Sequence, residues 1–104
     1  MDTDITDFQN KIYGILKKVP KGRVTTYKLL AQRLGSNAYR AVGTAMRKNP
    51  FAPIIPCHRV VCSNGEVGNY SGDGGANGKI KLLRDEGVEI DNNKIINFEK
   101  VLWR

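Results

Sequence analysis

Residues 25–48 read TTYKLLAQRLGSNAYRAVGTAMRK, and this stretch decides the fold. Leucines recur at helical spacing after Thr25, which is a good N-cap, and Gly35 ends this short helix. A second helix is expected over residues 38–48, because Asn49 and a proline follow it. A helix, a brief glycine-containing turn and a second helix form the arrangement called a helix-turn-helix.

The two faces of the helix predicted at 38–48 differ in character. One side holds Arg40, Gly43, Thr44 and Arg47, and it is basic and small at its middle. Glycine weakens a helix interior by up to ~1 kcal/mol relative to alanine, so Gly43 suggests that something approaches the backbone closely. A nucleic-acid groove is one candidate, and tight packing against another helix is the alternative. The opposite side is expected to hold Ala38, Ala41, Val42, Ala45 and Met46.

The flanking segments indicate a mainly helical fold class with little β-structure. Apolar residues at helical spacing predict a first helix that ends before Pro20 and a later helix that ends at Gly87. An Asp-Asn-Asn turn between two apolar runs predicts a C-terminal hairpin, and Asn97 can cap a last short helix. We therefore expect residues 1–104 to form one winged-helix-like helix-turn-helix domain with short strands. The expected elements are helices at about 5–19 and 79–86, a turn at 63–65, a mobile glycine-rich loop at 68–78, and strands at 88–90 and 94–96.

Positive charge is concentrated in the first two thirds of the chain. The net charge is +7, and no acidic residue lies between Asp7 and Glu66, where eleven Lys and Arg occur. Such a field favours nucleic acid as partner, with an anionic membrane as a weaker alternative and solubility alone as the simplest one. No apolar run is long enough to cross a bilayer, and the polar, acidic start is unlike a signal peptide. We expect a cytoplasmic protein, nucleoid-associated or, in a eukaryote, nuclear.

Residues 55–61, IPCHRVV, place the only histidine beside a cysteine within an apolar run. The proline before Cys57 fixes a bend that can hold the thiol at a pocket wall, and His58 can help to create the reactive thiolate. We therefore interpret Cys57 as a nucleophile rather than as a small buried apolar residue. Cys62 lacks such neighbours and is assigned to packing. Three soft ligands without a metal-binding spacing give no reason to expect a metal or another cofactor.

These motifs together resemble the methylated-DNA–protein-cysteine methyltransferases, which repair O6-alkylguanine. The resemblance is to their catalytic C-terminal domain, so the N-terminal domain of many members is expected to be absent from this chain. It is carried by Thr26-Tyr27, Arg40-Ala41-Val42-Gly43, Ala45-Met46-Arg47, Asn49-Pro50, residues 55–61, Gly68-Asn69-Tyr70-Ser71-Gly72 and Leu82-Leu83 with Glu86-Gly87.

The resemblance implies a single-turnover reaction at Cys57. The thiol would take the alkyl group from a flipped-out O6-alkylguanine, and O4-alkylthymine is a further substrate that it allows. His58 would act on Cys57 through a water, and Glu86 would orient the histidine. We expect an extended segment here, in which neighbouring side chains point to opposite faces, so a water is the natural link between Cys57 and His58. Tyr27 would donate to the departing guanine oxygen, as a transition-state donor does.

The resemblance also implies how DNA is held. The helix at 38–48 would lie in the minor groove, and Arg40 would fill the gap that the flipped base leaves. Double-stranded DNA with O6-alkylguanine is therefore the expected partner, with no membrane, no obligate protein partner and a monomeric state. Further DNA contacts are expected from Thr26, Ala41, Gly43 and Arg47, and the base pocket is expected to include Tyr70, Ser71, Val60, Met46 and Asn49.

Several alternatives stay open at this point. Taken alone, Tyr27 could be a core aromatic, Asn49 a plain helix terminator and Glu86 a solvated charge. Alkyltransferase-like proteins share the fold and bind lesions without repair, but have another residue, often tryptophan, in place of Cys57. A winged-helix regulator or a cysteine hydrolase are the other function classes. The polar loop at 73–78 departs from the family pattern and predicts a looser lid over the pocket.

Overall fold

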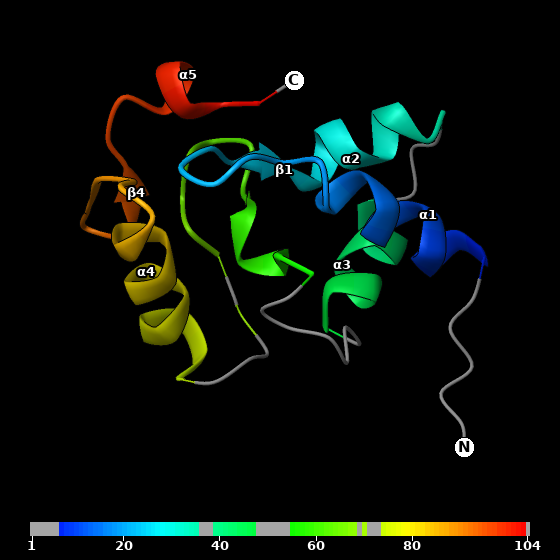
Figure 1. The fold of residues 1–104 in the computed structure, drawn as a ribbon, viewed down its shortest axis with the longest axis horizontal. Helices are drawn as coiled ribbons and strands as arrows, with labels where there is room; N and C mark the ends of the chain where they lie inside the picture. The colour runs from blue at the N-terminus through cyan, green and yellow to red at the C-terminus, as the bar shows by residue number, and fades with distance from the viewer. Residues whose placement is uncertain (1–6, 36–38, 48–54, 69, 71–73, 104) are drawn as a thin grey trace.

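The computed structural model describes residues 7–35, 39–47, 55–68, 70 and 74–103, and it confirms the predicted fold class. The protein is mostly helical with a few short strands (Figure 1). Within the described residues, every helix is too short or too polar to span a lipid bilayer. The elements are α1 Asp7–Leu16, β1 Thr25–Thr26, α2 Tyr27–Arg33, α3 Tyr39–Arg47, the 3₁₀ helix η1 Cys57–Arg59, β2 Val60–Val61, α4 Gly75–Asp85, β3 Ile90–Asp91, β4 Lys94–Ile95 and α5 Phe98–Val101.

Helices α2 and α3 form the predicted helix-turn-helix pair, but the cap of α2 is one residue later than expected. Thr26 Oγ1 accepts a 3.0 Å hydrogen bond from the amide of Leu29, so Thr26 is the N-cap. Thr25 belongs to strand β1 instead, where it pairs in parallel with Val60. Both threonines belong to β1, and Thr26, which pairs with Val61 at the end of the strand, also caps the helix that follows.

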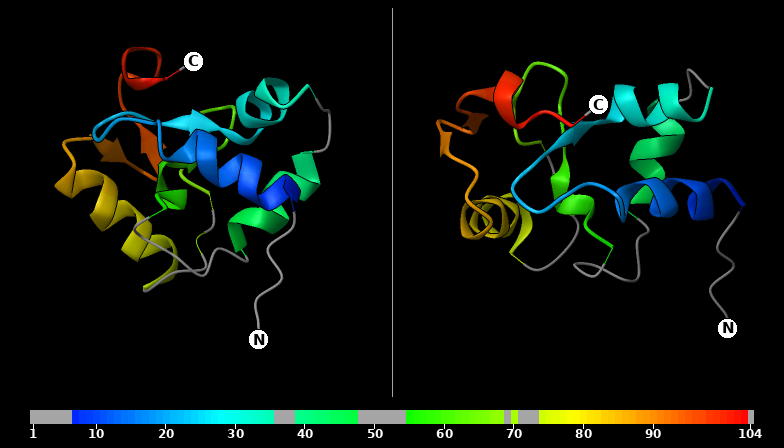
Figure 2. Two further views of the ribbon diagram at one scale, coloured as in Figure 1. Left: turned by 45° about the vertical axis from the view of Figure 1, so that its right-hand side comes forward. Right: turned by 45° about the horizontal axis from the view of Figure 1, so that its top comes forward.

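Strand β2 separates two apolar clusters. Val60 and Val61 are both fully buried, and as neighbours in a strand they point to opposite faces. Val60 packs in the cluster of helices α1, α2 and α3, whereas Val61 packs in the cluster beneath α4 and the hairpin. In Figures 1 and 2, α1–α3 accordingly lie on one side of β1 and β2, and α4 with the hairpin lies on the other.

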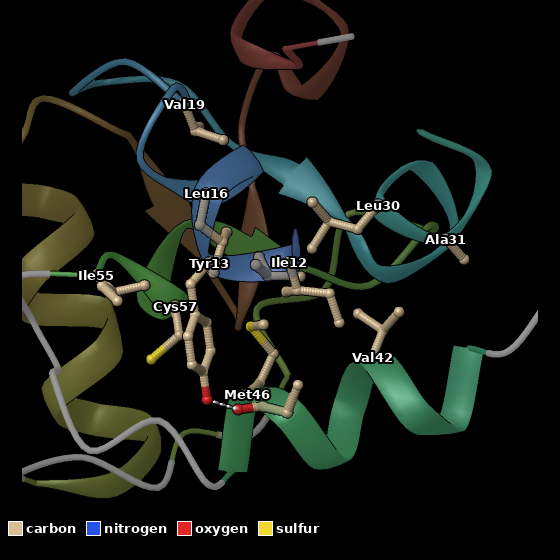
Figure 3. Close-up of a cluster of buried hydrophobic side chains, with 12 residues drawn as sticks. Ile12, Tyr13, Leu16, Val19, Leu30, Ala31, Val42, Met46, Ile55 and Cys57 are labelled. Carbon is tan, nitrogen blue, oxygen red and sulfur yellow. Dashed lines mark hydrogen bonds between the residues drawn. The ribbon is translucent and has the colours of Figure 1, made fainter. Parts of the chain in front are cut away.

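The first cluster joins α1 to the helix-turn-helix (Figure 3). Ile12, Leu30 and Val42 come from α1, α2 and α3 and are fully buried, which stabilises the fold by roughly 1.5–3 kcal/mol for each side chain. The hydroxyl of Tyr13 donates a 2.9 Å hydrogen bond to the carbonyl oxygen of Ala45 and ties α1 to α3. The position of α3 is thus set by apolar packing and by one long-range hydrogen bond.

The C-terminal hairpin is confirmed, with a two-residue turn. Ile90 pairs with Ile95, and Asn92 and Asn93 between the strands have φ values of +51° and +62°. Positive φ at both turn residues is the type I′ geometry that suits the twist of a hairpin, and asparagine tolerates it. Asn97 precedes α5 as predicted, but with φ of +57° its side chain makes no capping hydrogen bond.

Helix α4 begins earlier than predicted, within the glycine-rich segment. It starts at Gly75 rather than at Lys79, and Gly74 precedes it in a left-handed conformation with φ of +80°. The amide of Gly78 donates to the carbonyl oxygen of Gly74 at 3.1 Å. Residues 75–78 are therefore helical, and the prediction of a loop there was wrong, while residues 71–73 lie outside the described part. The turn at 63–65 is confirmed by the 2.9 Å bond from the Gly65 amide to the Cys62 carbonyl oxygen.

Candidate functional site

The cysteine segment is a tight turn followed by one turn of 3₁₀ helix. Pro56 has φ −81° and ψ 66°, and the Cys57 amide donates to the Ile55 carbonyl oxygen at 2.8 Å, which is an inverse γ-turn. The expected proline bend is therefore present. The expectation of an extended segment was wrong, because Arg59 bonds back to the Pro56 carbonyl oxygen at 3.0 Å and coils the chain. Cys57 is 4% exposed and packs in the first cluster.

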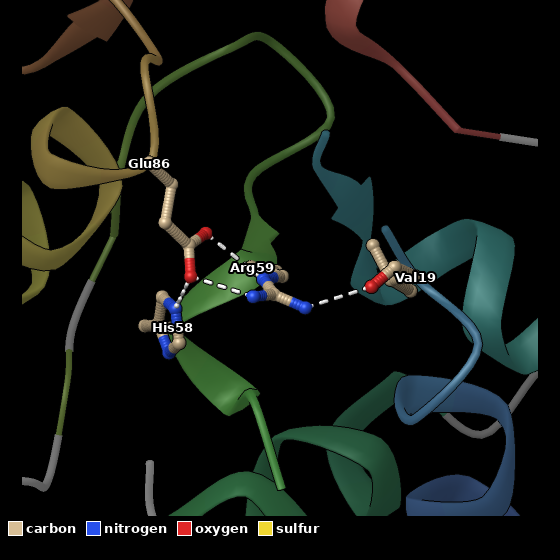
Figure 4. Close-up of polar contacts among 4 residues, drawn as sticks. All are labelled: Val19, His58, Arg59 and Glu86. Carbon is tan, nitrogen blue, oxygen red and sulfur yellow. Dashed lines mark hydrogen bonds and ion pairs between the residues drawn. The ribbon is translucent and has the colours of Figure 1, made fainter. Parts of the chain in front are cut away.

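His58 and Glu86 are in direct contact, as Figure 4 shows. His58 Nε2 lies 3.0 Å from Glu86 Oε2, and the imidazole is almost fully buried. Arg59 holds the same carboxylate through two further bonds, from Nε to Oε1 at 2.9 Å and from Nη2 to Oε2 at 2.6 Å. The alternative of Glu86 as a solvated surface charge is wrong, because its side chain is 12% exposed and accepts three hydrogen bonds, one from His58 and two from Arg59.

The charges around this pair define the protonation of His58. Burial alone would raise the pKa of Glu86, but hydrogen bonds from Arg59 and His58 outweigh burial and hold it below its ordinary value. Burial lowers the pKa of His58; Glu86 opposes this, whereas the charges of Arg59 and Lys79 add to the lowering. The pair at neutral pH is therefore an ionised carboxylate and a neutral imidazole.

That pairing also fixes the tautomer of His58. An ionised carboxylate only accepts hydrogen bonds, so Nε2 carries the proton and donates to Glu86. Nδ1 then keeps its lone pair as an acceptor. It is buried and has no hydrogen-bond partner within the described residues. The imidazole is thus arranged as a base whose free nitrogen is Nδ1.

A cavity of about 480 Å³ opens in front of Cys57. It lies between α2, α3 and the cysteine segment and brings together half of the predicted site residues, which come from four separate stretches of the sequence. Among the described lining residues, Thr44 was predicted to lie on the outward face of the helix but was not predicted as a site residue. The lining residues are Tyr27, Arg40, Gly43, Thr44, Met46, Arg47, Cys57 and Tyr70.

Helix α3 presents the predicted faces to this cavity and to the core. Arg40 and Arg47 are exposed, while Val42 and Ala45 on the opposite face are buried. A Cβ added at Gly43 would meet nothing within 4 Å among the described residues. The alternative that Gly43 is required for packing against another helix is therefore wrong within that part of the chain, and its backbone lies open at the cavity.

Tyr27 reaches the cavity from the first turn of α2. Burial raises the pKa of its phenol to about 12, with the nearby thiols of Cys62 and Cys57 adding to the effect. The phenol is therefore protonated across the physiological range and available as a donor. Gly68 makes room behind it, because a Cβ at that glycine would lie 3.2 Å from Cys62 Sγ and 3.9 Å from the Tyr27 hydroxyl.

The other predicted residues lie around the cavity rather than in its lining. Thr26 is buried and its hydroxyl caps α2, and Ala41 is half-buried on α3. Val60, the residue that directly follows η1, is fully buried. Asn49 and Ser71 lie outside the described residues. Within the described part, no three His, Cys, Asp or Glu side chains gather closely enough to hold a metal ion.

Lys79 is a feature of the site that the sequence analysis missed. Its side chain is 1% exposed, and its Nζ donates a 2.7 Å hydrogen bond to the carbonyl oxygen of Val60. Burial lowers the pKa of this amine to about 8, although the thiols of Cys62 and Cys57 oppose the shift. Because lysine side chains are usually exposed, the sequence alone gives no reason to expect that Lys79 is buried. The available signal was helical spacing, because Lys79 lies four residues before Leu83 of α4 and seven before its C-cap residue Glu86, which places the three on one face.

Residues 7–88, which are most of the chain, match the sequence model of the family described as 6-O-methylguanine DNA methyltransferase, DNA binding domain. The chain belongs to this family. The methylated-DNA--protein-cysteine methyltransferase of Homo sapiens is similar, with 53% identity over 77 residues, or 73% of this chain and 36% of that protein. The resemblance at the level of the family is thereby confirmed.

Two solved structures are also similar to this member of the 6-O-methylguanine DNA methyltransferase family. Mycobacterium tuberculosis OGT in complex with DNA has a TM-score of 0.75 and 41% identity, covering 82% of this chain and 52% of OGT. S. pombe Atl1 in complex with damaged DNA containing O6-carboxymethylguanine has a TM-score of 0.80 and 30% identity, covering 100% of this chain and 99% of Atl1. By contrast, the chain spans between 30% and 52% of the length of the curated relatives.

Proposed function

We propose that the chain is a catalytic domain that transfers the alkyl group of O6-alkylguanine in double-stranded DNA to Cys57. The observation that carries the proposal is the cavity in which the thiol meets Tyr27 and the basic face of α3. A nucleophile, a protonated donor and a positively charged entrance are the parts that such a transfer needs.

The proposed transfer begins with proton removal from Cys57. Nδ1 of neutral His58 accepts the thiol proton through a water, and Glu86 stabilises the imidazolium that forms. The Cys57 sulfur then attacks the alkyl carbon, a carbon–sulfur bond forms and the bond from carbon to O6 breaks. Its electron pair stays with guanine, which takes a proton from Tyr27. The proton on His58 later returns to the phenolate through solvent, so the balance is one thioether and one restored guanine.

DNA binding is proposed to use α3. Flipping a base out of the stack costs a few kcal/mol and leaves a gap, which the exposed side chain of Arg40 would fill. Arg47 would neutralise phosphate, and the open backbone at Gly43 would allow the groove to come close. Support comes from the relatives solved with DNA, of which S. pombe Atl1 is in complex with damaged DNA.

The base pocket is proposed to lie against Met46 and Tyr70, which line the cavity with Cys57. Backbone groups of Val60 and Ser71 would hold the base edge, and Asn49 would brace the turn before the cysteine segment. Tyr70 offers an aromatic face on which an extruded base can stack.

A second candidate is lesion binding without transfer. It is favoured by the match to S. pombe Atl1, which is covered almost completely by this chain. In such a protein the alkyl group would stay on the DNA, and Cys57 would be a wall of the pocket rather than a nucleophile. The presence of a thiol at the cavity is the reason to prefer transfer.

Intact-mass spectrometry separates the two candidates. The protein is mixed with excess duplex that contains a single O6-methylguanine, and the modified peptide is then located. Transfer predicts one methyl group on Cys57 and no further turnover. Cys57→Ser should bind the lesion and gain no mass, and Cys62→Ser should be methylated like the wild type. Tight lesion binding with unchanged wild-type mass would contradict transfer and establish the lesion-binding function.

A further inference from the structure

Arg59 is the one polar residue of 55–61 without a part in the proposed chemistry, yet its side chain makes three hydrogen bonds. Besides its two bonds to Glu86, its Nη1 donates to the carbonyl oxygen of Val19 at 2.8 Å. Val19 follows α1 and Glu86 ends α4, so the guanidinium is held from both sides (Figure 4). A planar fork fixed in this way has a defined position and orientation.

The geometry of the carboxylate links Arg59 to His58. Glu86 Oε2 accepts from Arg59 at 2.6 Å and from His58 at 3.0 Å, so the two donors share one oxygen. The bidentate grip of Arg59 prevents the carboxylate from rotating and reduces the negative charge that His58 experiences. A carboxylate without this partner would stabilise a protonated imidazole more strongly.

We propose that Arg59 is a positioning residue that acts through Glu86 on His58: it fixes the carboxylate and keeps the imidazole uncharged, with Nδ1 free to accept a proton. This inference rests on the proposed function in one respect, because the accepted proton is that of Cys57. The effect of Arg59 on the charge of His58 does not depend on transfer.

Three charged side chains, which come from η1 and from α4 with its C-cap, face His58. Glu86 at the end of α4 is the negative group, while Arg59 in η1 and Lys79 in α4 are positive. Cys57 precedes His58 in η1 and is the group that gives up the proton. Two cations against one shared carboxylate, in a buried site, disfavour imidazolium.

The test is a proton NMR titration of the free protein, which is unambiguous because the chain has one histidine. The wild-type midpoint is expected below the ordinary histidine value. Arg59→Gln should move it upward, and Arg59→Lys, which keeps the charge but loses the fork, should move it less. Arg23→Gln is the matched control, because Arg23 also donates to backbone carbonyl oxygens, those of Val101 and Leu102, but not to Glu86.

A double variant tests the route through Glu86. In the Glu86→Gln background, Arg59→Gln should shift the midpoint less than it does in the wild type. An equal shift in both backgrounds would overturn the route through the carboxylate. A wild-type midpoint above the ordinary value would overturn the proposal without any variant, which protects the test if Arg59→Gln does not fold.

The rate of transfer from free O6-benzylguanine tests whether the protonation state of His58 controls the proposed reaction. Below its midpoint His58 is protonated and cannot accept the thiol proton, so the acidic limb of the transfer rate should follow the NMR midpoint in each variant. If the acidic limb of the transfer rate stayed at the same pH in a variant whose His58 midpoint moves, His58 would not be the group that accepts the thiol proton. If no Cys57 adduct forms at all while the titrations behave as expected, the proposed function fails and the effect of Arg59 on His58 stands.

Discussion

Lys79 Nζ donates a 2.7 Å hydrogen bond to the carbonyl oxygen of Val60, so a buried amine lies behind the strand that leaves the cysteine segment. Edge carbonyl groups of a two-stranded sheet need a partner when they are buried. Here the partner comes from a helix on the other side of β2, and it connects α4 to the same segment that Arg59 holds.

The depressed pKa of Lys79 predicts how stability changes with pH. Burial lowers its pKa to about 8 from the ordinary 10.5, so above about pH 8 the unfolded chain binds more protons than the folded one. The free energy of unfolding should therefore rise with pH, by up to ~1.4 kcal/mol per pH unit from this group. Denaturant unfolding of wild type and Lys79→Met between about pH 8 and about pH 10 measures the difference.

The control for this prediction is Lys81→Met, since Lys81 lies on the same helix and is exposed. It should follow the wild-type pH dependence. A difference between wild type and Lys79→Met that is constant with pH would show that the amine does not titrate in this range.

Removing the hydroxyl of Tyr27 should slow transfer without loss of fold. Tyr27→Phe deletes the proposed donor to the guanine oxygen, and loss of one such donor typically costs about 10²–10³ in rate. Single-turnover transfer from duplex DNA is the measurement. Tyr13→Phe is the matched control, because its hydroxyl bonds to Ala45 and should affect stability more than rate. Equal rates for Tyr27→Phe and wild type would remove the donor role.

Arg40 should matter for duplex DNA and not for the free base. Arg40→Ala removes the side chain that is proposed to fill the gap left by the flipped base, so repair of a duplex is expected to slow far more than reaction with free O6-benzylguanine. Lys28→Ala removes an exposed positive charge of α2 that does not line the cavity, and it should change both rates little. Parallel losses on both substrates after Arg40→Ala would argue against base flipping by this residue.

Gly43 separates stability from DNA binding. Because an added Cβ meets nothing within 4 Å among the described residues, Gly43→Ala should stabilise α3 by roughly 0.5–1 kcal/mol. Affinity for duplex DNA should fall at the same time if the groove approaches this backbone. Gly14→Ala in α1 has the same open surroundings and should stabilise the protein without weakening DNA binding. Undiminished affinity in Gly43→Ala would exclude close approach at α3.

Much of the fold could be predicted because it depends on periodic patterns. The buried Val42 and exposed Arg40 of α3 follow from helical spacing, and the hairpin follows from its two-asparagine turn. The boundaries that failed depend on tertiary contacts. Thr25 does not cap the helix as expected, because it pairs in a strand with Val60, which lies 35 residues later in the chain. Gly75 entered α4 although glycine has a low helix propensity.

Short sequence motifs predicted which residues gather at the cavity, whereas contacts between residues far apart in the sequence were missed. Cys57, Tyr27 and Arg40 meet in one cavity, as the motifs indicated. The grip of Arg59 on Glu86 joins residues 27 positions apart, and no local pattern reveals it. Burial of Lys79 is similarly invisible, because it depends on what packs over α4.

The opposite orientations of Val60 and Val61 make strand β2 common to both apolar clusters. Neither cluster can open without exposing the backbone that the other needs, so the two halves should unfold as one cooperative unit. Amide hydrogens of η1 and β2 are then expected to exchange with solvent only through global unfolding. The segment that carries the proposed nucleophile would thus be among the slowest-exchanging parts of the molecule, although it borders an open cavity.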